Sequence, residues 1–189
     1  MTLVRVFLMA LIFTSCGLHV LTAQDHFLVE LENRSPDVKA QVKAYEGYPS
    51  ILFLAKDTDG VEHSVGSLKG KTSFLWFWNE DCPKCIEHIT ALNRVQDENP
   101  NTLQVLSFSD NKKEEVLAFQ AMNSMSFPVI ANSKLLADGP YGGDFGYPRL
   151  FIVDQFGVIK YVIPEVEMRG DFDAYGFFEA VERSLQKSK

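Results

Sequence analysis

The chain has 189 residues, 46% of them hydrophobic, and a formal net charge of −7 at pH 7. This length and composition predict one globular domain with short additions. The acidic balance argues against nucleic acid or an anionic membrane surface as a partner.

The N-terminus predicts a secretory leader. A single positive charge at Arg5 precedes an almost wholly apolar run over residues 6–13. A charged start followed by a short apolar stretch is typical of a signal peptide, and the run is shorter than the roughly 20 residues of a spanning helix. We therefore expect export to the periplasm or cell envelope.

Two cleavage sites remain open. Ala23 suits ordinary signal peptidase, and the segment stays apolar beyond Cys16, which favours a leader over residues 1–23. The run 14–17 resembles a lipoprotein box, which would end the leader before a lipidated Cys16. The expected organisation is then an N-terminal extension over residues 24–46 and the main domain over residues 47–189.

The next segments predict short elements. Residues 26–32 alternate weakly, as in a strand, and Pro36–Tyr45 suits a short helix. Asp59-Gly60 lies between two strand-like runs, Ile51–Ala55 and Glu62–Val65. Asp-Gly in that setting predicts a β-hairpin.

From residue 72 onward, strand-like and helix-like segments alternate. The predicted strands are Thr72–Trp78, Leu103–Ser109, Arg149–Val153 and Val158–Ile163. The predicted helices are Pro83–Glu98, Asn111–Ser124 (capped by Asn111 or Asp110) and Asp171–Gln186. The order β-α-β-α-β-β-α, with a hairpin in front and an insertion over Met125–Tyr147, predicts an α/β sheet covered on both faces.

Apolar spacing predicts which helix faces are buried. For the first helix, the inward residues are expected to be Ile86, Ile89, Leu92 and Val95. For the last helix, they are expected to be Phe177, Phe178, Val181 and Leu185.

Cys82 and Cys85 stand between a buried strand and an amphipathic helix. The partial positive charge of a helix N-terminus favours a thiolate, and C-x-x-C at such a junction predicts a dithiol/disulfide centre. Disulfides persist in exported proteins, and the mature domain has no third cysteine with which to form a long-range staple. A structural zinc site usually needs four ligands, and the sequence has no second C-x-x-C.

Several motifs together suggest a family. They are Gly60, Leu68-Lys69-Gly70-Lys71, Phe77-Trp78, Cys82-Pro83-Lys84-Cys85, Ala91-Leu92-Asn93, Phe127-Pro128-Val129 and Tyr147–Asp154 followed by Gly157. In this order they resemble the exported TlpA/ResA-like thiol-disulfide oxidoreductases over residues 47–187. The resemblance implies a thioredoxin-like fold with an N-terminal hairpin extension and a central insertion.

The departures from the family concern proton acceptors. Asp81 stands where a Trp often precedes the first cysteine, and His88 stands where the family commonly has Glu. Thr90 replaces a helix-kinking proline, and Trp76 occupies the position of thioredoxin's buried Asp. The usual proton acceptors near the dithiol are therefore missing or replaced.

The resemblance assigns roles to the cysteines. Cys82 is expected to attack a substrate disulfide, and Cys85 to resolve the mixed disulfide. His88, with Glu87 beside it, is the candidate proton relay to Cys85; the alternative is an ordinary solvated helix histidine. No metal or other cofactor is expected.

The resemblance also assigns a substrate contact. Pro148 is expected to form the cis-proline that faces the dithiol, and Tyr147 before it to pair its backbone with an extended substrate. The implied partners are disulfide-containing exported proteins, apocytochrome cysteines among them, and a membrane redox partner that supplies electrons.

Three other functions are associated with this fold or with paired cysteines. A disulfide-forming oxidant would use the same cysteines in the opposite direction. A copper chaperone of this fold usually has C-x-x-x-C and a distant His, for which His26, His63 and His88 are the possible donors. A peroxidase needs Pro-x-x-x-Thr-x-x-Cys, but Leu75 and Asn79 occupy those Pro and Thr positions before Cys82.

Overall fold

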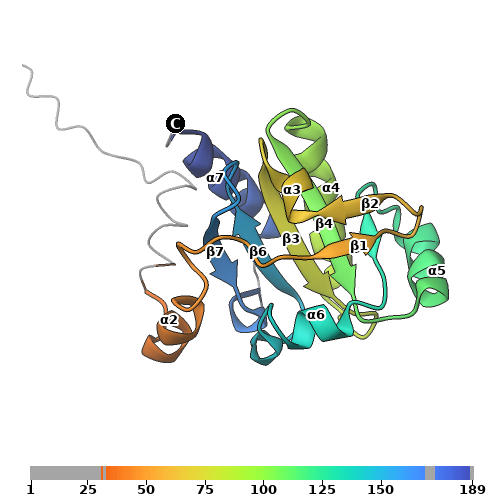
Figure 1. Cartoon of the computed structure of the whole chain (residues 1–189), viewed down its shortest axis with the longest axis horizontal. Helices are drawn as coiled ribbons and strands as arrows, with labels where there is room; N and C mark the ends of the chain where they lie inside the picture. Colours follow the sequence, from red (N-terminus) through yellow and green to blue (C-terminus); the bar gives the residue numbers. More distant parts are fainter. Residues whose placement is uncertain (1–30, 32, 169–172, 188–189) are drawn as a thin grey trace, which may run out of the picture.

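The computed structural model describes residues 31, 33–168 and 173–187, and its centre is a five-stranded sheet (Figure 1). The strand order is β5-β4-β3-β6-β7; β3, β4 and β5 run parallel, whereas β6 is antiparallel to both of its neighbours. The strands are β3 (Thr72–Trp78), β4 (Leu103–Ser109), β5 (Val129–Ile130), β6 (Arg149–Val153) and β7 (Ile159–Ile163). The bounds predicted for β3, β4 and β6 are confirmed, and β7 begins one residue later than predicted.

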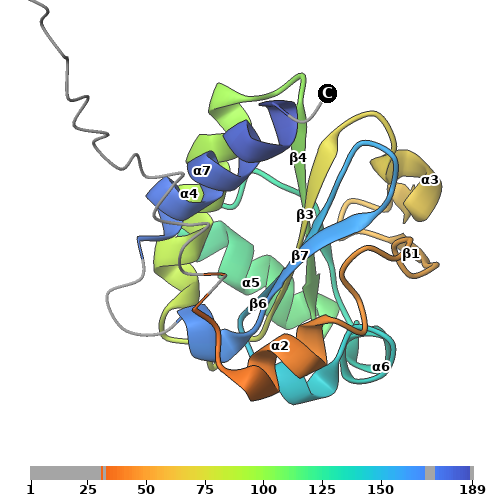
Figure 2. The same cartoon turned by 90° about the vertical axis from the view of Figure 1, so that its left-hand side faces the viewer.

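Helices cover both faces of this sheet (Figure 2). They are α2 (Pro36–Val42), α3 (Val65–Leu68), α4 (Cys85–Glu98), α5 (Lys113–Asn123), α6 (Lys134–Asp138) and α7 (Ala174–Lys187), with the 3-10 helices η1 (Gly143–Phe145) and η2 (Glu165–Met168). α4, α5 and α7 pack into one apolar core, and α2, α3 and α6 into the other. The predicted hairpin is confirmed as β1 (Leu54–Lys56) paired with β2 (Glu62–Ser64).

The central strand β3 explains why both faces need covering. All seven of its residues are buried, with Trp76 facing one core and Phe77 the other. Side chains alternate across a strand, so a strand that is apolar on both sides is stable only between two layers. Each large apolar side chain buried in this way stabilises the fold by roughly 1.5–3 kcal/mol.

Several predicted helix details are wrong. α4 begins at Cys85 rather than Pro83, because a tight turn, closed by a 3.2 Å bond from Cys85 N to Cys82 O, precedes the helix. Its buried residues include Ile89, and Ile86 is 54% exposed. In α7, Phe178 is buried as predicted, whereas Phe177 is only partly buried.

Some predictions lie outside the described residues. These are the leader, nearly all of the strand predicted over residues 26–32, and the predicted helix start at Asp171. Within the described chain, no helix is both long enough and apolar enough to cross a membrane.

Candidate active site

Three loops meet at one edge of the sheet. Trp78 at the end of β3 pairs with Ser109 at the end of β4, and Phe77 pairs with Arg149 at the start of β6. β6 runs against β3, so its first residue lies at the edge where β3 ends. The turn with Cys82, the loop after β4 and the segment Tyr147–Pro148 therefore share this edge.

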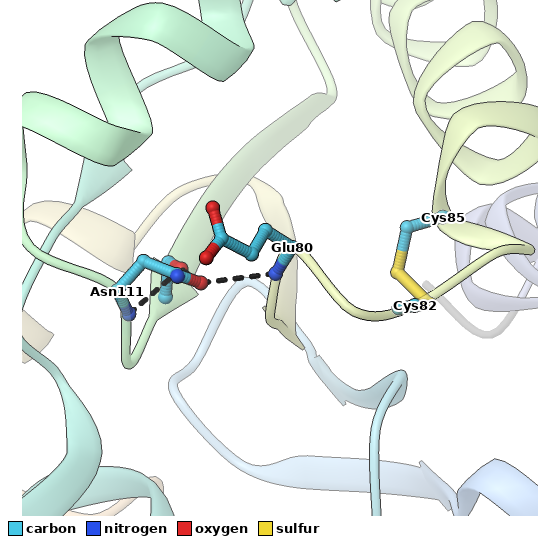
Figure 3. Close-up of a disulfide and its surroundings, with 5 residues drawn as sticks. Glu80, Cys82, Cys85 and Asn111 are labelled. Carbon is cyan, nitrogen blue, oxygen red and sulfur yellow. Dashed lines mark hydrogen bonds between the residues drawn. A yellow bond between two sulfur atoms is a disulfide. The ribbon is translucent and has the colours of Figure 1, made fainter.

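Cys82 and Cys85 form a disulfide where this edge meets α4 (Figure 3). Cys85 is the first residue of the helix, and the two Cα atoms lie 5.4 Å apart. Cys82 is 8% exposed and Cys85 is 0% exposed. Cys82 is thus the more exposed of the two residues, which agrees with the attacking role expected for it.

The interior behind the disulfide is aromatic. The rings of Trp76 and Trp78 stack with centroids 5.6 Å apart, and Trp78 also lies 4.6 Å from Phe119 of α5. Both tryptophans are fully buried in the same apolar core as Cys82 and Cys85. They pack beneath the cysteines and are not exposed to a substrate.

His88 is a buried core residue rather than a solvated one. It lies one turn after Cys85 on the buried face of α4 and is 1% exposed, with its ring 6.5 Å from Trp76 and 6.4 Å from Phe178. Burial lowers the pKa of His88 from 6.5 to about 4, although the carboxylate of Glu87 opposes the shift. Glu87 itself points to solvent, 65% exposed and 3.5 Å from Lys84. The structure therefore places His88, but not Glu87, on the cysteine side of the helix.

We expect acid to destabilise the protein through His88. Between pH 6.5 and pH 4 the histidine is protonated in the unfolded chain but neutral in the folded protein. The contribution of this group to the free energy of unfolding is therefore complete above pH 6.5 and is lost as the pH falls toward 4. The loss from this group is about 3 kcal/mol. Urea unfolding at pH 7 and pH 4 should show that the free energy of unfolding falls by about 3 kcal/mol more in the wild type than in His88→Gln. An NMR titration of His88 near pH 6.5 would contradict this expectation.

The peptide bond between Tyr147 and Pro148 is cis, which confirms the sequence prediction for this proline. The bond lies just before β6, at the edge that carries the disulfide. Burial raises the pKa of Tyr147, whose ring is half-buried beside the neighbouring arginine. Substrate contact by this pair stays a prediction.

Arg149 holds the insertion against β6. It is fully buried and donates to three carbonyl oxygens: Nε to Tyr141 at 2.9 Å, Nη1 to Gly146 at 2.7 Å and Nη2 to Ala137 at 2.6 Å. Its guanidinium also lies 4.6 Å from the centre of the Tyr147 ring. Arg149 therefore fixes the glycine-rich loop and the residue before the cis-proline together.

Arg149 and Asn111 were not predicted as site residues. Asn111 was interpreted as an N-cap, but the helix begins at Lys113, where the N–H of Lys112 donates to the carboxylate of Glu115. The Oδ1 atom of Asn111 instead accepts from the N–H of Glu80, in the turn before Cys82 (Figure 3). The only sequence signal for this role of Asn111 is a polar residue just after a strand. That signal does not distinguish a helix N-cap from a hydrogen bond to another loop.

The histidines that could act as copper donors do not lie together beside the cysteines in the described part of the chain. His63 pairs with Asp57 at 2.8 Å in the hairpin, and that bond helps to lower the pKa of Asp57 against the opposing effect of burial. His26 lies outside the described residues. In the part of the chain that the structure describes, no three His, Cys, Asp or Glu side chains gather as a metal site would require.

A sheet of this order, with a C-x-x-C disulfide at the start of a helix and a cis-proline at the same edge, defines a thioredoxin-fold protein with a redox centre. Residues 37–162 match the AhpC/TSA family, and the chain belongs to that family. The peroxidase pattern is absent from this member, since Leu75 and Asn79 stand where it requires Pro and Thr.

Named relatives agree with this class. The chain is 28% identical over 126 residues to the thioredoxin-like protein YneN of Bacillus subtilis, covering 65% of this chain and 73% of that protein. It is 26% identical over 101 residues to the thiol-disulfide oxidoreductase ResA of Halalkalibacterium halodurans, covering 52% of this chain and 57% of that protein. The expected TlpA/ResA-like resemblance and enzyme class are thereby confirmed.

Solved structures confirm the fold. One, described as the thiol:disulfide interchange protein DsbE of Chlorobium tepidum, has a TM-score of 0.63 and 22% identity, covering 76% of this chain and 96% of that one. A secreted disulfide oxidoreductase of Mycobacterium tuberculosis has a TM-score of 0.60 and 18% identity, covering 70% and 96%. At these identities the likeness establishes the thioredoxin-like fold alone.

Proposed function

We propose that this protein is an exported thiol-disulfide oxidoreductase that reduces disulfides of exported proteins. The observation that carries the proposal is the Cys82–Cys85 disulfide at the start of α4, in which Cys82 is the more exposed residue. The cis-proline segment at the same edge supports an extended substrate paired along Tyr147.

The proposed reaction has two exchanges. In the dithiol form, the Cys82 thiolate attacks a substrate disulfide, forms a mixed disulfide and releases one substrate thiolate. Cys85 then attacks the sulfur of Cys82, which releases the second substrate thiolate and closes the protein disulfide. The substrate gains two electrons, and a membrane redox partner must return two electrons to the protein.

His88 is the proposed acceptor for the proton of Cys85. It lies one turn further along the same buried face. Its imidazole is neutral at neutral pH, which leaves one ring nitrogen unprotonated, but the pKa of about 4 makes it a weak base that would hold the proton only transiently. The His88→Gln variant also tests this role. An unchanged rate and pH profile of the resolving step would remove His88 from the mechanism.

The reducing direction rests on charge. Exposed Glu80 and Asp81 precede Cys82 in the chain, although the Glu80 carboxylate is directed toward Asn111 rather than the disulfide (Figure 3), and Lys84 is the opposing cation, itself 3.5 Å from Glu87. Carboxylates disfavour a nearby thiolate, whereas a strong oxidant owes its high potential to a stabilised reduced form. An acidic approach to the dithiol therefore favours a reductant.

Export rests on the leader and on the relatives. The first 23 residues have the pattern of a signal peptide, with a lipoprotein leader before Cys16 as the other possibility. The Mycobacterium tuberculosis neighbour is described as secreted. A periplasmic or envelope location also suits a protein whose only expected substrates are disulfides.

The decisive measurement is the equilibrium reduction potential of the Cys82–Cys85 pair in a thiol redox buffer. We expect a value near or below about −270 mV, the potential of thioredoxin. A value near about −120 mV would instead make the protein an oxidant. Failure of the two cysteines to form a disulfide in solution would overturn the redox function itself.

A further inference from the structure

The turn that carries Cys82 is tied to a neighbouring loop by one side chain. The N–H of Glu80 donates to Oδ1 of Asn111 at 2.9 Å (Figure 3). The other bonds of the turn are internal: Cys82 N–H to the carbonyl of Asn79 at 3.3 Å, and Cys85 N–H to the carbonyl of Cys82 at 3.2 Å. Lys84 bonds to the start of α4, where its carbonyl accepts from the N–H of His88 at 3.3 Å and its Nζ donates to Glu87 at 3.5 Å. The bond to Asn111 instead joins the turn to the loop after β4.

Asn111 is itself held from several sides. Its Oδ1 also accepts from the hydroxyl of buried Ser109 at 3.1 Å, and the same hydroxyl accepts the N–H of Asn111 at 3.2 Å. Its Nδ2 donates to Glu115 of α5 at 3.4 Å, and its carbonyl accepts from the N–H of Asn132 at 2.9 Å. The carboxamide oxygen is therefore a fixed acceptor, anchored to β4, α5 and the insertion.

We propose that Asn111 is a positioning residue for the attacking sulfur. By holding the N–H of Glu80, its carboxamide fixes the turn two residues before Cys82 and so sets the direction from which Sγ approaches a substrate disulfide. Displacement at sulfur needs the attacking and leaving atoms aligned, and prior orientation of reacting groups accelerates such steps. The inference rests on the proposed function, since it concerns the first exchange of that reaction.

The test uses the pre-reduced protein and dithiodipyridine, a neutral disulfide whose released thiol absorbs light. The Cys82 thiolate forms a bond to one sulfur of the probe and expels one thiolate; Cys85 then closes the protein disulfide and expels the second. The rate constant of the first step is measured where it no longer rises with pH, so that the fraction of thiolate does not affect it.

Asn111→Ala is expected to lower this rate constant about fivefold, the factor that corresponds to one ordinary hydrogen bond. Asn111→Asp keeps an acceptor oxygen for the N–H of Glu80 and is expected to restore most of the rate on the same plateau. A role in α5 alone would not predict this recovery, because Asp lacks the Nδ2 donor to Glu115.

Asn93 offers a matched control. Its Oδ1 accepts from the N–H and the hydroxyl of Ser126 at 3.0 and 2.8 Å, and its Nδ2 donates to the carbonyl of Ser124 at 2.8 Å. Asn93→Ala thus removes a similar side-chain tie, here between α4 and the segment after α5, without touching the Cys82 turn, and should leave the rate constant unchanged.

Three results would overturn the proposal: a wild-type rate in Asn111→Ala, an equal loss in Asn93→Ala, or no recovery in Asn111→Asp. A wild-type protein whose Cys82 does not react with the probe would contradict the proposed function instead.

Discussion

Cys82→Ser is expected to abolish disulfide reduction, whereas Cys85→Ser should still complete the first exchange and then stop. A serine hydroxyl cannot form a disulfide, and the remaining thiol of Cys85 is fully buried, so Cys82→Ser has no sulfur that a substrate can reach. In Cys85→Ser the Cys82 thiolate can attack, but no thiol remains to resolve the mixed disulfide. Mass spectrometry with a disulfide-containing peptide should show one stable adduct per chain, on Cys82.

The matched control is the reduced wild type, which lacks the disulfide but keeps both sulfurs. Comparing the variants with this form separates the loss of chemistry from any loss of stability caused by removing the cross-link. A stable adduct on Cys85 in the Cys82→Ser variant would reverse the assignment of the two roles.

The central strands β3 and β6 were predictable because their apolar residues are compatible with few structures other than a buried strand. Phe74–Trp78 and Leu150–Val153 are apolar on both faces, and polar residues follow each run, so the apolar pattern and the flanking residues indicate the same strands. The redox pair was equally predictable, since two cysteines separated by two residues after a buried strand have few other uses. The cis bond at Pro148 followed from the family resemblance, not from local propensity.

What the sequence did not reveal was the direction in which polar side chains point. His88 and Ile86 lie two positions apart on α4 and so on opposite faces of the helix; the histidine is buried, and the isoleucine is 54% exposed. The disulfide turn delays the start of the helix to Cys85 and places that residue on the inner face, and His88 then follows one turn later on the same face. Hydrophobicity alone predicts a buried Ile86 and an exposed His88, the reverse of what the structure shows.

Asn111 and Arg149 illustrate the same limit. Each bonds to groups distant in sequence: Asn111 to the backbone of Glu80, 31 residues away, and Arg149 to the carbonyl of Ala137, 12 residues away. Such contacts depend on which loops the tertiary fold brings together. From the sequence alone, an arginine at the start of an apolar strand is expected to be a surface charge. Only the structure shows the backbone carbonyls that Arg149 contacts.

Arg149→Met is expected to destabilise the protein by about 3 kcal/mol or more, because three carbonyl oxygens each lose their donor at a cost of about 1–3 kcal/mol. Exchanging a whole buried ion pair for apolar side chains can be neutral, but here the partners are the backbone carbonyls of Ala137, Tyr141 and Gly146, which no substitution removes. Each carbonyl left without a donor adds its own desolvation penalty. Urea unfolding of the oxidised protein, followed by the fluorescence of buried Trp76 and Trp78, would measure the loss.

Arg183→Met provides the matched control, because Arg183 is an exposed arginine that pairs with Glu179 one turn away in α7. Exposed pairs of this spacing contribute about 0.3–0.5 kcal/mol, so this variant should unfold close to the wild type. Arg149→Lys should fall between the two, because an ammonium has three donors but lacks the planar fork that reaches three separate carbonyls. If Arg149→Met were no less stable than Arg183→Met, the buried guanidinium would not be what holds the insertion and the cis-proline segment in place.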